Sequence, residues 1–231
     1  MRRQSLCFLY YMGIIRNVLS VLLLDTNGVQ SVVKKTTVIL GVTGHRNIDM
    51  TDKALIKRIT TEIRHIKKVH KASNFVILSG LAEGADRLVA QIAIKELQAQ
   101  LIAVLAVPEE FFLMDFADDR SKRAFKSYLK RSRTIITAPL LSKKAWQDYT
   151  ASRNNQYAWI GAFIARHSNY LLAIWDGKPA RGRGGTAEVV RWFKGGRIPK
   201  LMLTDIIKQA RKAGVKKRDK RSVHEFVHVK V

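Results

Sequence analysis

From Thr37 onward, short runs of Val, Ile and Leu alternate with longer segments in which apolar residues recur every three or four positions. Continuous apolar runs are typical of strands covered on both faces, and the longer spacing is typical of amphipathic helices. The expected strands are 37–42, 75–79, 101–107, 134–138, 170–175 and 198–203. The expected helices are 52–69, 85–97, 109–115, 119–130, 154–167 and 187–194. This alternation predicts an α/β protein with a Rossmann-like three-layer fold and a mainly parallel sheet.

The two ends of the chain depart from this pattern. We expect residues 1–35 to form an N-terminal extension, residues 36–204 the folded domain and residues 205–231 a basic C-terminal tail. The extension contains a mainly apolar stretch that Arg16 interrupts, and a central charge makes membrane insertion costly. Three interpretations of it stay open: a weak membrane anchor, an extension that packs against a partner, and residues encoded upstream of the true start.

Composition limits the classes of protein to consider. A chain of 231 residues with 47% hydrophobic residues can bury one substantial core. Cys7 is the single cysteine, so an intramolecular disulfide cannot form, and a cytoplasmic location is expected. The formal net charge of +24 predicts attraction to polyanions. The basic tail is interpreted either as a solvated segment or as a nucleic-acid contact.

Glycines gather at three expected strand-to-helix junctions. They are Gly41 and Gly44, then Gly80 and Gly84, and finally Gly182, Gly184 and Gly185. In a parallel sheet all such junctions lie at the carboxyl edge, so the three turns are expected to converge on one crevice. Glycine lets a phosphate approach the backbone, and the first turn of a helix offers unpaired N–H groups. The donors expected beside these turns are His45, Arg46, Arg181 and Arg183.

Polar residues at the same junctions complete the candidate site. Its expected ligand-binding residues are Gly41, Thr43, Gly44, His45, Arg46, Ser79, Gly80, Glu83, Gly84, Asp86, Asp176, Gly184, Gly185, Thr186 and Glu188. Structural roles compete with ligand contact at several of them, because an acid or a threonine also stabilises the start of a helix. Asp176 either binds a ribose or orients its loop. The sequence has no Cys/His cluster and no Walker lysine motif, so neither a metal site nor a cofactor is expected.

Three segments carry a resemblance to a known group of proteins. Residues 41–46 (GVTGHR), 78–87 (LSGLAEGADR) and 173–188 (AIWDGKPARGRGGTAE) resemble the SLOG superfamily. This Rossmannoid group includes the Lonely Guy (LOG) phosphoribohydrolases and the DprA recombination mediators, and many of its members sense ligands without turning them over. The resemblance implies that residues 36–204 form a SLOG-like nucleotide-binding domain. It also implies that a nucleotide or nucleotide-derived ligand is bound chiefly by Gly184, Gly185, Thr186 and Glu188.

The chain departs from the LOG enzymes within the last segment. Their pattern is Pro-Gly-Gly-x-Gly-Thr-x-x-Glu, with the glutamate three residues after the threonine, whereas Glu188 follows Thr186 by two. The resemblance to the superfamily therefore does not by itself imply LOG-like glycosidase activity.

Three classes of function stay open at this point. The first is binding or sensing of a nucleotide-type ligand. The second is cleavage of the N-glycosidic bond of a nucleotide, as in LOG-like hydrolases or deoxyribosyltransferases, with Glu188 as the catalytic carboxylate and Asp176 or Glu83 assisting. The third is DprA-like binding of single-stranded nucleic acid, supported by the net charge of +24 and by the aromatic residues Trp146, Tyr149, Tyr157 and Trp159 near basic residues.

The same pattern bears on association with other copies and with membranes. The helix at 154–167 has an apolar face broad enough to pack against a second subunit, but burial within the monomer is the favoured explanation. Membrane association is not expected of the folded domain.

Overall fold

The computed structural model describes residues 36–71, 73–116, 118–140, 151–179, 182–216 and 222–231, together with two short strands near the N-terminus. The chain divides into two units, Met1–Thr36 and Thr37–Val231. In the first unit, β1 (Leu22–Leu23) pairs in the antiparallel direction with β2 (Ser31–Val32). The second unit contains the α/β fold and every residue discussed below.

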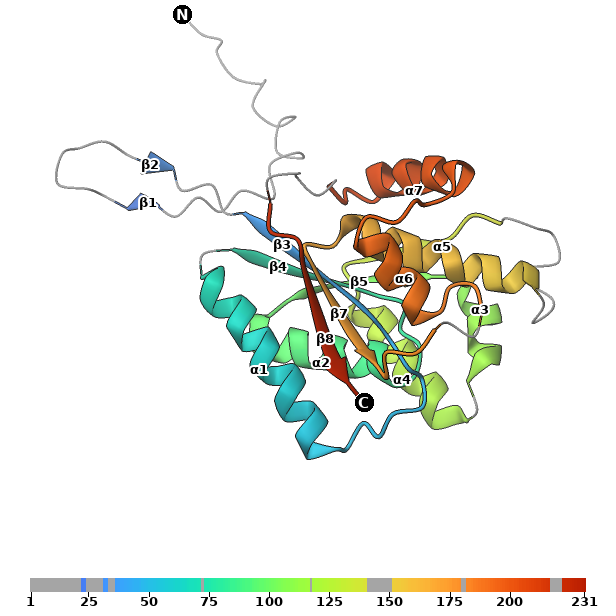
Figure 1. Ribbon diagram of the computed structural model, residues 1–231, viewed down its shortest axis with the longest axis horizontal. Coiled ribbons are helices and arrows are strands. Elements are labelled where there is room, and N and C mark those ends of the chain that lie inside the picture. The colour runs from blue at the N-terminus through green and yellow to red at the C-terminus, as the bar shows by residue number, and fades with distance from the viewer. Residues whose placement is uncertain are drawn as a thin grey trace, which may run out of the picture. The chain divides into compact units, whose positions relative to one another are not determined.

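A six-stranded parallel sheet forms the centre of the second unit (Figure 1), with the strand order β6-β5-β4-β3-β7-β8. The strands are β3 (Thr37–Gly44), β4 (Asn74–Ser79), β5 (Gln100–Leu105), β6 (Thr134–Thr137), β7 (Tyr170–Trp175) and β8 (Glu225–Lys230). From β3 the chain first adds strands toward one edge, and after β6 it returns to the other side of β3. The neighbours β3 and β7 therefore lead into connections on opposite sides of the sheet, a position where open parallel sheets form a crevice.

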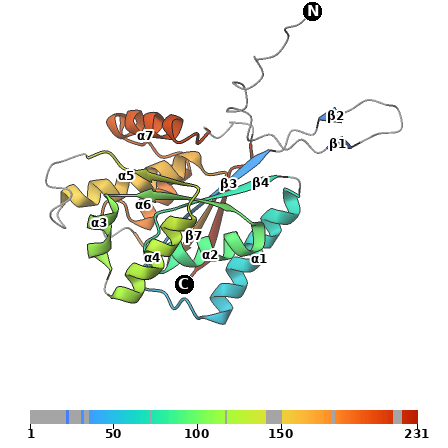
Figure 2. The same ribbon diagram turned by 180° about the vertical axis from the view of Figure 1, so that it is seen from behind.

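Helices cover both faces of the sheet (Figures 1 and 2). One face carries α1 (Lys53–Val69), α2 (Ala85–Leu97) and α4 (Asp119–Arg131), and α3 (Glu109–Phe112) and η1 (Leu113–Asp115) connect β5 to α4. The other face carries α5 (Ala151–His167) and α6 (Thr186–Phe193), with α7 (Lys200–Lys212) packed on α5. The prediction of a Rossmann-like three-layer α/β fold is confirmed, and the described sheet is parallel throughout.

The first helix shows how the sequence pattern sets the layers. The side chain of Asp52 caps α1 by accepting hydrogen bonds from the N–H groups of Ala54 and Leu55. Every buried residue of α1 belongs to the apolar stripe with spacings of four and three, namely Leu55, Ile59, Ile63 and Ile66. Lysines and arginines fill the opposite face, so the stripe determines which side of the helix meets the sheet.

The broad apolar face of α5 packs within the chain. Trp159 and Phe163 are fully buried, and their rings stack with centroids 5.4 Å apart. The hydrophobic core of the monomer therefore accounts for the width of this face.

The segment after α6 differs from the strand expected at 198–203. Pro199 instead precedes α7, in which the buried residues Met202, Ile206 and Ala210 recur every four positions. Leu201 is 79% exposed, so the short apolar run is not buried as a strand would be. The strand prediction was wrong because the helical spacing continues beyond Leu203.

The end of the chain supplies the outer strand β8. It pairs in parallel with β7 from Glu225, opposite Tyr170, to Lys230, opposite Trp175. Val227 and Val229 are buried, whereas the residues between and after them are exposed. This alternation gives a polar strand one apolar face. Residues 205–231, expected as a basic tail, thus contain the end of α7 and the strand β8. Residues 217–221, which hold part of the basic run, lie outside the described residues.

One close backbone contact joins the turns that follow β3 and β4. Gly84 precedes α2 with φ +75° and ψ −122°, a conformation that residues with a Cβ rarely adopt. A Cβ at this position would collide with the carbonyl oxygen of Arg46 and lie 2.6 Å from that of His45. The N–H of Ala85 donates to the same His45 oxygen at 3.0 Å, so backbone atoms alone fix the first two turns against each other.

We expect Gly84→Ala to destabilise the fold by more than about 3 kcal/mol, because backbone strain and a collision with fixed carbonyl groups add together. Gly177→Ala is the matched control, since Gly177 has φ +84° but nothing within 4 Å of its Cβ position. That variant should lose only about 1 kcal/mol. Urea unfolding of both proteins measures the difference, and equal losses would show that the close contact is unimportant.

Candidate ligand-binding site

The carboxyl ends of β3 and β7 are joined by a pair of polar residues. The Nε2 atom of His45 lies 3.2 Å from the carboxylate of Asp176 and 3.3 Å from its backbone nitrogen. The backbone N–H of Lys178, and then hydrogen bonds from the side chains of His45 and Lys178, lower the pKa of the Asp176 carboxyl group. Both members of the pair keep part of their side chains exposed, 39% for His45 and 26% for Asp176. A carboxylate ionised over a wide pH range therefore lies at the point where the strand order reverses.

The turn after β4 is held by buried polar groups. Ser79 is fully buried, and its hydroxyl accepts from the N–H of Leu81 at 3.1 Å and donates to the carbonyl of Asp86 at 3.2 Å. The carboxylate of Asp86 accepts from the N–H of Ala82 at 3.3 Å. These bonds position the turn, so Ser79 supports the site from beneath and does not face a ligand.

Burial of the Asp86 carboxyl group raises its pKa from 3.8 to about 6, against the opposing effects of the Ala82 N–H, Arg46 and Arg87. The residue as a whole keeps some exposed surface, although its carboxyl group is enclosed by the turn. Asp86 thus exchanges a proton at a higher pH than an exposed aspartate does.

Glu83 belongs to a chain of polar contacts that leads away from the edge. The hydroxyl of Ser121, on α4, donates a short hydrogen bond to the Glu83 carboxylate. Arg87 donates to the Ser121 oxygen at 2.8 Å and to the carbonyl of Leu81 at 3.0 Å, and its guanidinium lies over the Phe116 ring. This chain fixes the β4 turn on α4, so Glu83 has a structural partner of its own.

The glycine-rich loop before α6 is closed by Glu188. Its carboxylate accepts from the N–H of Gly184 at 2.8 Å and from Arg191 at 3.3 Å. Gly184 has φ +79°, and a Cβ there would lie 2.6 Å from the backbone nitrogen of Ala158. The loop therefore rests directly on the backbone of α5. No side chain caps the first turn of α6, which begins at Thr186 after Gly185.

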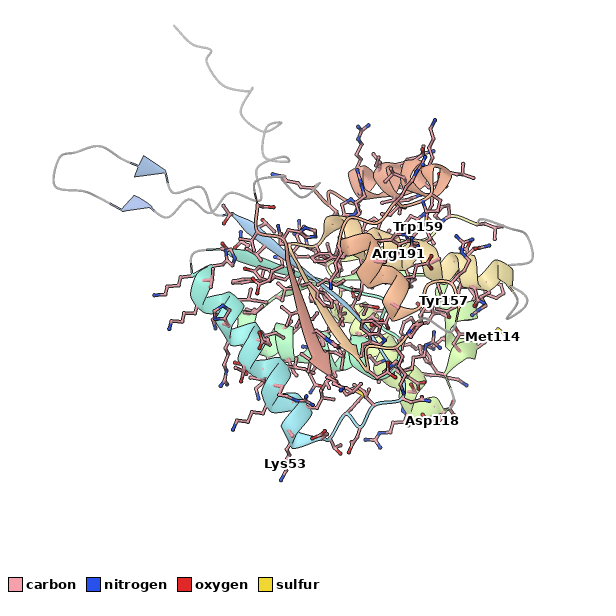
Figure 3. The ribbon with its side chains drawn as sticks, in the orientation of Figure 1. Lys53, Met114, Asp118, Tyr157, Trp159 and Arg191 are labelled. Carbon is pink, nitrogen blue, oxygen red and sulfur yellow. The ribbon has the colours of Figure 1, made fainter. Side chains whose placement is uncertain are left out.

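Tyr157 on α5 connects this loop with the β3 turn. The guanidinium of Arg46 lies 5.2 Å from the centre of the Tyr157 ring, and the Cβ position of Gly184 is 2.8 Å from the Tyr157 carbonyl carbon. The Tyr157 hydroxyl donates a short hydrogen bond to Asp115, to which Arg153 donates at 2.6 Å. Figure 3 shows Tyr157 on α5, on the side of the molecule that also carries Met114 and Asp118.

The structure thus brings the three expected turns together. Gly84 joins the β4 turn to the β3 turn, and Tyr157 lies between the β3 turn and the loop before α6. The residues of the expected site that keep exposed or partly exposed surface at this edge are Gly44, His45, Arg46, Glu83, Asp86, Asp176, Gly184, Gly185 and Glu188. Thr186 is 9% exposed at the start of α6.

Three of the expected ligand-binding residues lie within β3, whose last residue is Gly44. Gly41 is paired with Leu78 and Leu171 in the middle of the sheet, and a Cβ there would lie 2.6 Å from the side chain of Ile164. The assignment of Gly41 to a turn is therefore corrected, because this glycine admits the end of α5 close to the strand. Thr43 is 8% exposed and paired with Ala173, so it supports the edge from inside the sheet.

The candidate residues for stacking nucleic-acid bases are not gathered on one described surface. Trp159 is fully buried, and the hydroxyl and ring of Tyr157 contact Asp115 and Arg46. Trp146, Tyr149 and the expected phosphate donor Arg181 lie outside the described residues. The exposed Arg183 donates to Asn155 on α5 at 2.8 Å.

Sequence reasoning missed the residues that hold the edge from α4, α5 and η1. Arg153 and Asp115 form an ion pair with exposed side-chain fractions of 3% and 2%, and neither was a candidate. Arg87 was noted only as part of a motif. A charged residue alone in an apolar helical face could have indicated a buried ion pair. The sequence could not have identified the partner, because the two residues lie far apart along the chain.

Comparisons with known proteins add no family to this description. No protein-family model matches the sequence, and no curated protein matches it significantly. Within the described part of the chain, no helix combines the length and the apolar character needed to cross a membrane. The same residues contain no group of three His, Cys, Asp or Glu side chains placed to hold a metal ion.

We expect the stability of the protein to respond to the proton on Asp86. Because its pKa is about 6 in the folded state and 3.8 ordinarily, the folded protein binds the proton more tightly. The contribution of Asp86 to the free energy of unfolding therefore falls as the pH rises from about 4 to 6. Asp86→Asn should be about 1–2 kcal/mol more stable than the wild type at pH 7.5, because an amide is not ionised in the enclosed turn, and should gain little at pH 4.

Urea unfolding at the two pH values measures this effect. Asp119→Asn is the control, because the Asp119 side chain is 80% exposed and should show no comparable pH-dependent gain. A gain for Asp86→Asn that is equal at pH 4 and pH 7.5 would contradict the explanation from buried charge.

A second expectation concerns the loop that Glu188 closes. Glu188→Ala removes the acceptor for the Gly184 N–H and should cost about 1 kcal/mol, whereas Glu188→Gln retains an acceptor oxygen and should lose less. Trypsin should cut faster after the exposed Arg183 in the alanine variant, as identified by mass spectrometry of the fragments. Equal cleavage in the wild type and both variants would show that Glu188 does not hold the loop.

Proposed function

We propose that this chain binds a nucleotide or nucleotide-derived ligand at the carboxyl edge of its sheet, between β3 and β7, and acts as a sensor of that ligand. The observation that carries the proposal is the meeting of three turns at the point where the strand order reverses. Two of them are fixed to each other by the contact at Gly84, and the third reaches them through Tyr157. Parallel sheets place their ligands at this position.

The charges at the edge favour an anionic ligand. Arg46 and Arg183 are exposed there, and the positive end of the α6 dipole lies next to Gly185, without a side chain that caps it. A phosphate group would bind at the first turn of α6. Asp176 remains ionised beside His45, which suits it to accept hydrogen bonds from the hydroxyls of a ribose.

The resemblance to SLOG proteins supports the same ligand class, because its three segments form the three turns. It also supports sensing without turnover, which is common in that superfamily. Glu188, the carboxylate that glycosidic cleavage would require, is held by Gly184 and Arg191. Because these hydrogen bonds tie the Glu188 carboxylate to its own loop, they favour a role in positioning the loop over a role as a catalytic acid.

Thermal unfolding of the full chain with AMP, ADP, ADP-ribose and cyclic dinucleotides tests the proposal. A ligand present at 100 times its Kd stabilises the folded state by about 2.7 kcal/mol. For a protein of this size that corresponds to a rise in Tm of about 5–10 °C. At least one of these nucleotides should produce such a rise, without release of free base detectable by chromatography.

Two variants at Gly185 locate the phosphate. Gly185 has φ −69° and ψ 160°, which any residue can adopt, and both Asp and Asn are favoured before a helix. Gly185→Asp should keep the fold but remove the rise in Tm, because its carboxylate repels the phosphate. Gly185→Asn has nearly the same shape without the charge and should retain most of the rise.

The outcomes separate the three classes of function. No rise in Tm with any nucleotide would overturn the proposal, and an unchanged rise in Gly185→Asp would overturn the placement of the phosphate. Release of base that is abolished by Glu188→Gln would establish a glycosidase instead. Salt-sensitive binding of single-stranded DNA without any nucleotide effect would favour the nucleic-acid class.

A further inference from the structure

A cavity lies at the opposite edge of the sheet from the proposed nucleotide site. Its volume is about 530 Å3, and it is lined by the last residues of α5 and α6, the start of α7 and the residue before β8. Because α5 and α6 run back toward the starts of the strands, their final turns lie at the amino edge. Cavities of this volume are within the range that small-molecule sites occupy.

The charged groups around this cavity all have the same sign. Arg166, Arg197 and Lys200 line it, and its described lining includes no aspartate or glutamate. Lys200 also begins α7, a helix of 13 residues whose first turn receives no side-chain cap from Pro199. The unpaired N–H groups and the positive end of the helix dipole add to the positive potential there.

Two buried donors among the lining residues lack acceptors. Neither the Nε1 atom of Trp192 nor the Nε atom of Arg166 has a hydrogen-bond partner among the described residues. Trp192 is only 4% exposed. A buried donor without a partner is unfavourable, and such groups often mark a place where a ligand or water is bound. Both unpaired groups are donors, and the described lining has no carboxylate to accept from them.

The rest of the lining is made of aromatic rings, aliphatic side chains and two glycines. The ring of His224 lies edge-on to that of Phe193, with centroids 4.0 Å apart, and both residues line the cavity beside Trp192. Flat apolar surfaces of this kind favour an aromatic ligand. The cavity therefore combines an apolar wall with cations, a combination that suits one molecule having both a ring and an anionic group.

We infer that this cavity is a second binding site, specific for small aromatic anions that carry a carboxylate, sulfonate or phosphate group. The anionic group contacts Arg197, Lys200 and the first turn of α7, and the ring lies against Trp192 and Phe193. The inference does not depend on the proposed nucleotide site, because the two sites share no residue.

Titration of the full chain with 8-anilinonaphthalene-1-sulfonate, a fluorescent aromatic sulfonate, tests this inference. We expect one saturable site per chain. The double substitution Arg197→Gln with Lys200→Gln should raise the Kd at least about tenfold, the effect of losing two charged contacts. Both residues are exposed, so the variant should remain folded, as far-UV circular dichroism can verify.

The matched control is Lys57→Gln with Lys68→Gln, which removes the same charge from the exposed face of α1. Its Kd should stay within about twofold of the wild type, since screening by salt weakens attraction over long distances. An equal loss of affinity in both double variants would show that the affinity for the dye depends only on the net charge of the protein, and it would overturn the inference.

Competition defines the ligand class. 1-Naphthoate should displace the dye, whereas the neutral 1-naphthalenemethanol should not, because it lacks the anionic group. Displacement by both compounds to the same extent would overturn the requirement for an anion. Gly185→Asp should leave dye binding unchanged, so failure of this site and failure of the nucleotide site can be told apart.

Discussion

The contact of Gly84 with the carbonyl groups of His45 and Arg46 is the constraint on which the arrangement of the carboxyl edge depends. It brings the start of α2 against the turn after β3 at a distance that no other residue type permits. Because backbone atoms make this junction, the side chains of His45 and Arg46 are not used to build it. They remain at the surface, where His45 can pair with Asp176 and Arg46 can lie over Tyr157.

The acidic residues near this edge are mostly engaged by the protein itself. Asp115 is bound by Arg153 and Tyr157, and Glu188 by Gly184 and Arg191. Burial makes Asp86 harder to ionise. With 42 lysines and arginines against 18 acids in the whole chain, the exposed arginines at the edge retain a positive potential. Because the carboxylates are bound by groups of the protein itself, they leave the exposed arginines to attract anions.

The sequence was sufficient to predict the layers and most elements, and its failures have identifiable causes. The bounds of α2 and β7 are as expected: α2 begins directly after Gly84, and β7 ends directly before Asp176. The C-terminal helix and strand were missed because a high density of positive charge concealed the weak apolar spacing of Met202 and Ile206 and the alternation around Val227.

The candidate site was predictable to a similar degree. The meeting of the three turns follows from parallel topology alone. The contacts of Tyr157 and Arg153 with Asp115 join residues that are 42 and 38 positions apart, which local spacing cannot reveal. Gly41 was misplaced because a glycine that admits a neighbouring helix looks the same in sequence as one that forms a turn.

Helix α6 connects the two edges of the sheet, since its first turn lies at the proposed nucleotide site and its last residues line the cavity at the amino edge. A ligand at one end could affect the other only by moving this helix between two arrangements. At its middle, however, Val189 packs closely on Gly161 of α5, where a Cβ would lie 2.5 Å from the valine side chain. A sliding movement of α6 would therefore have to displace α5 and the core around Trp159. The packing of these two helices favours two sites that bind independently on one rigid frame.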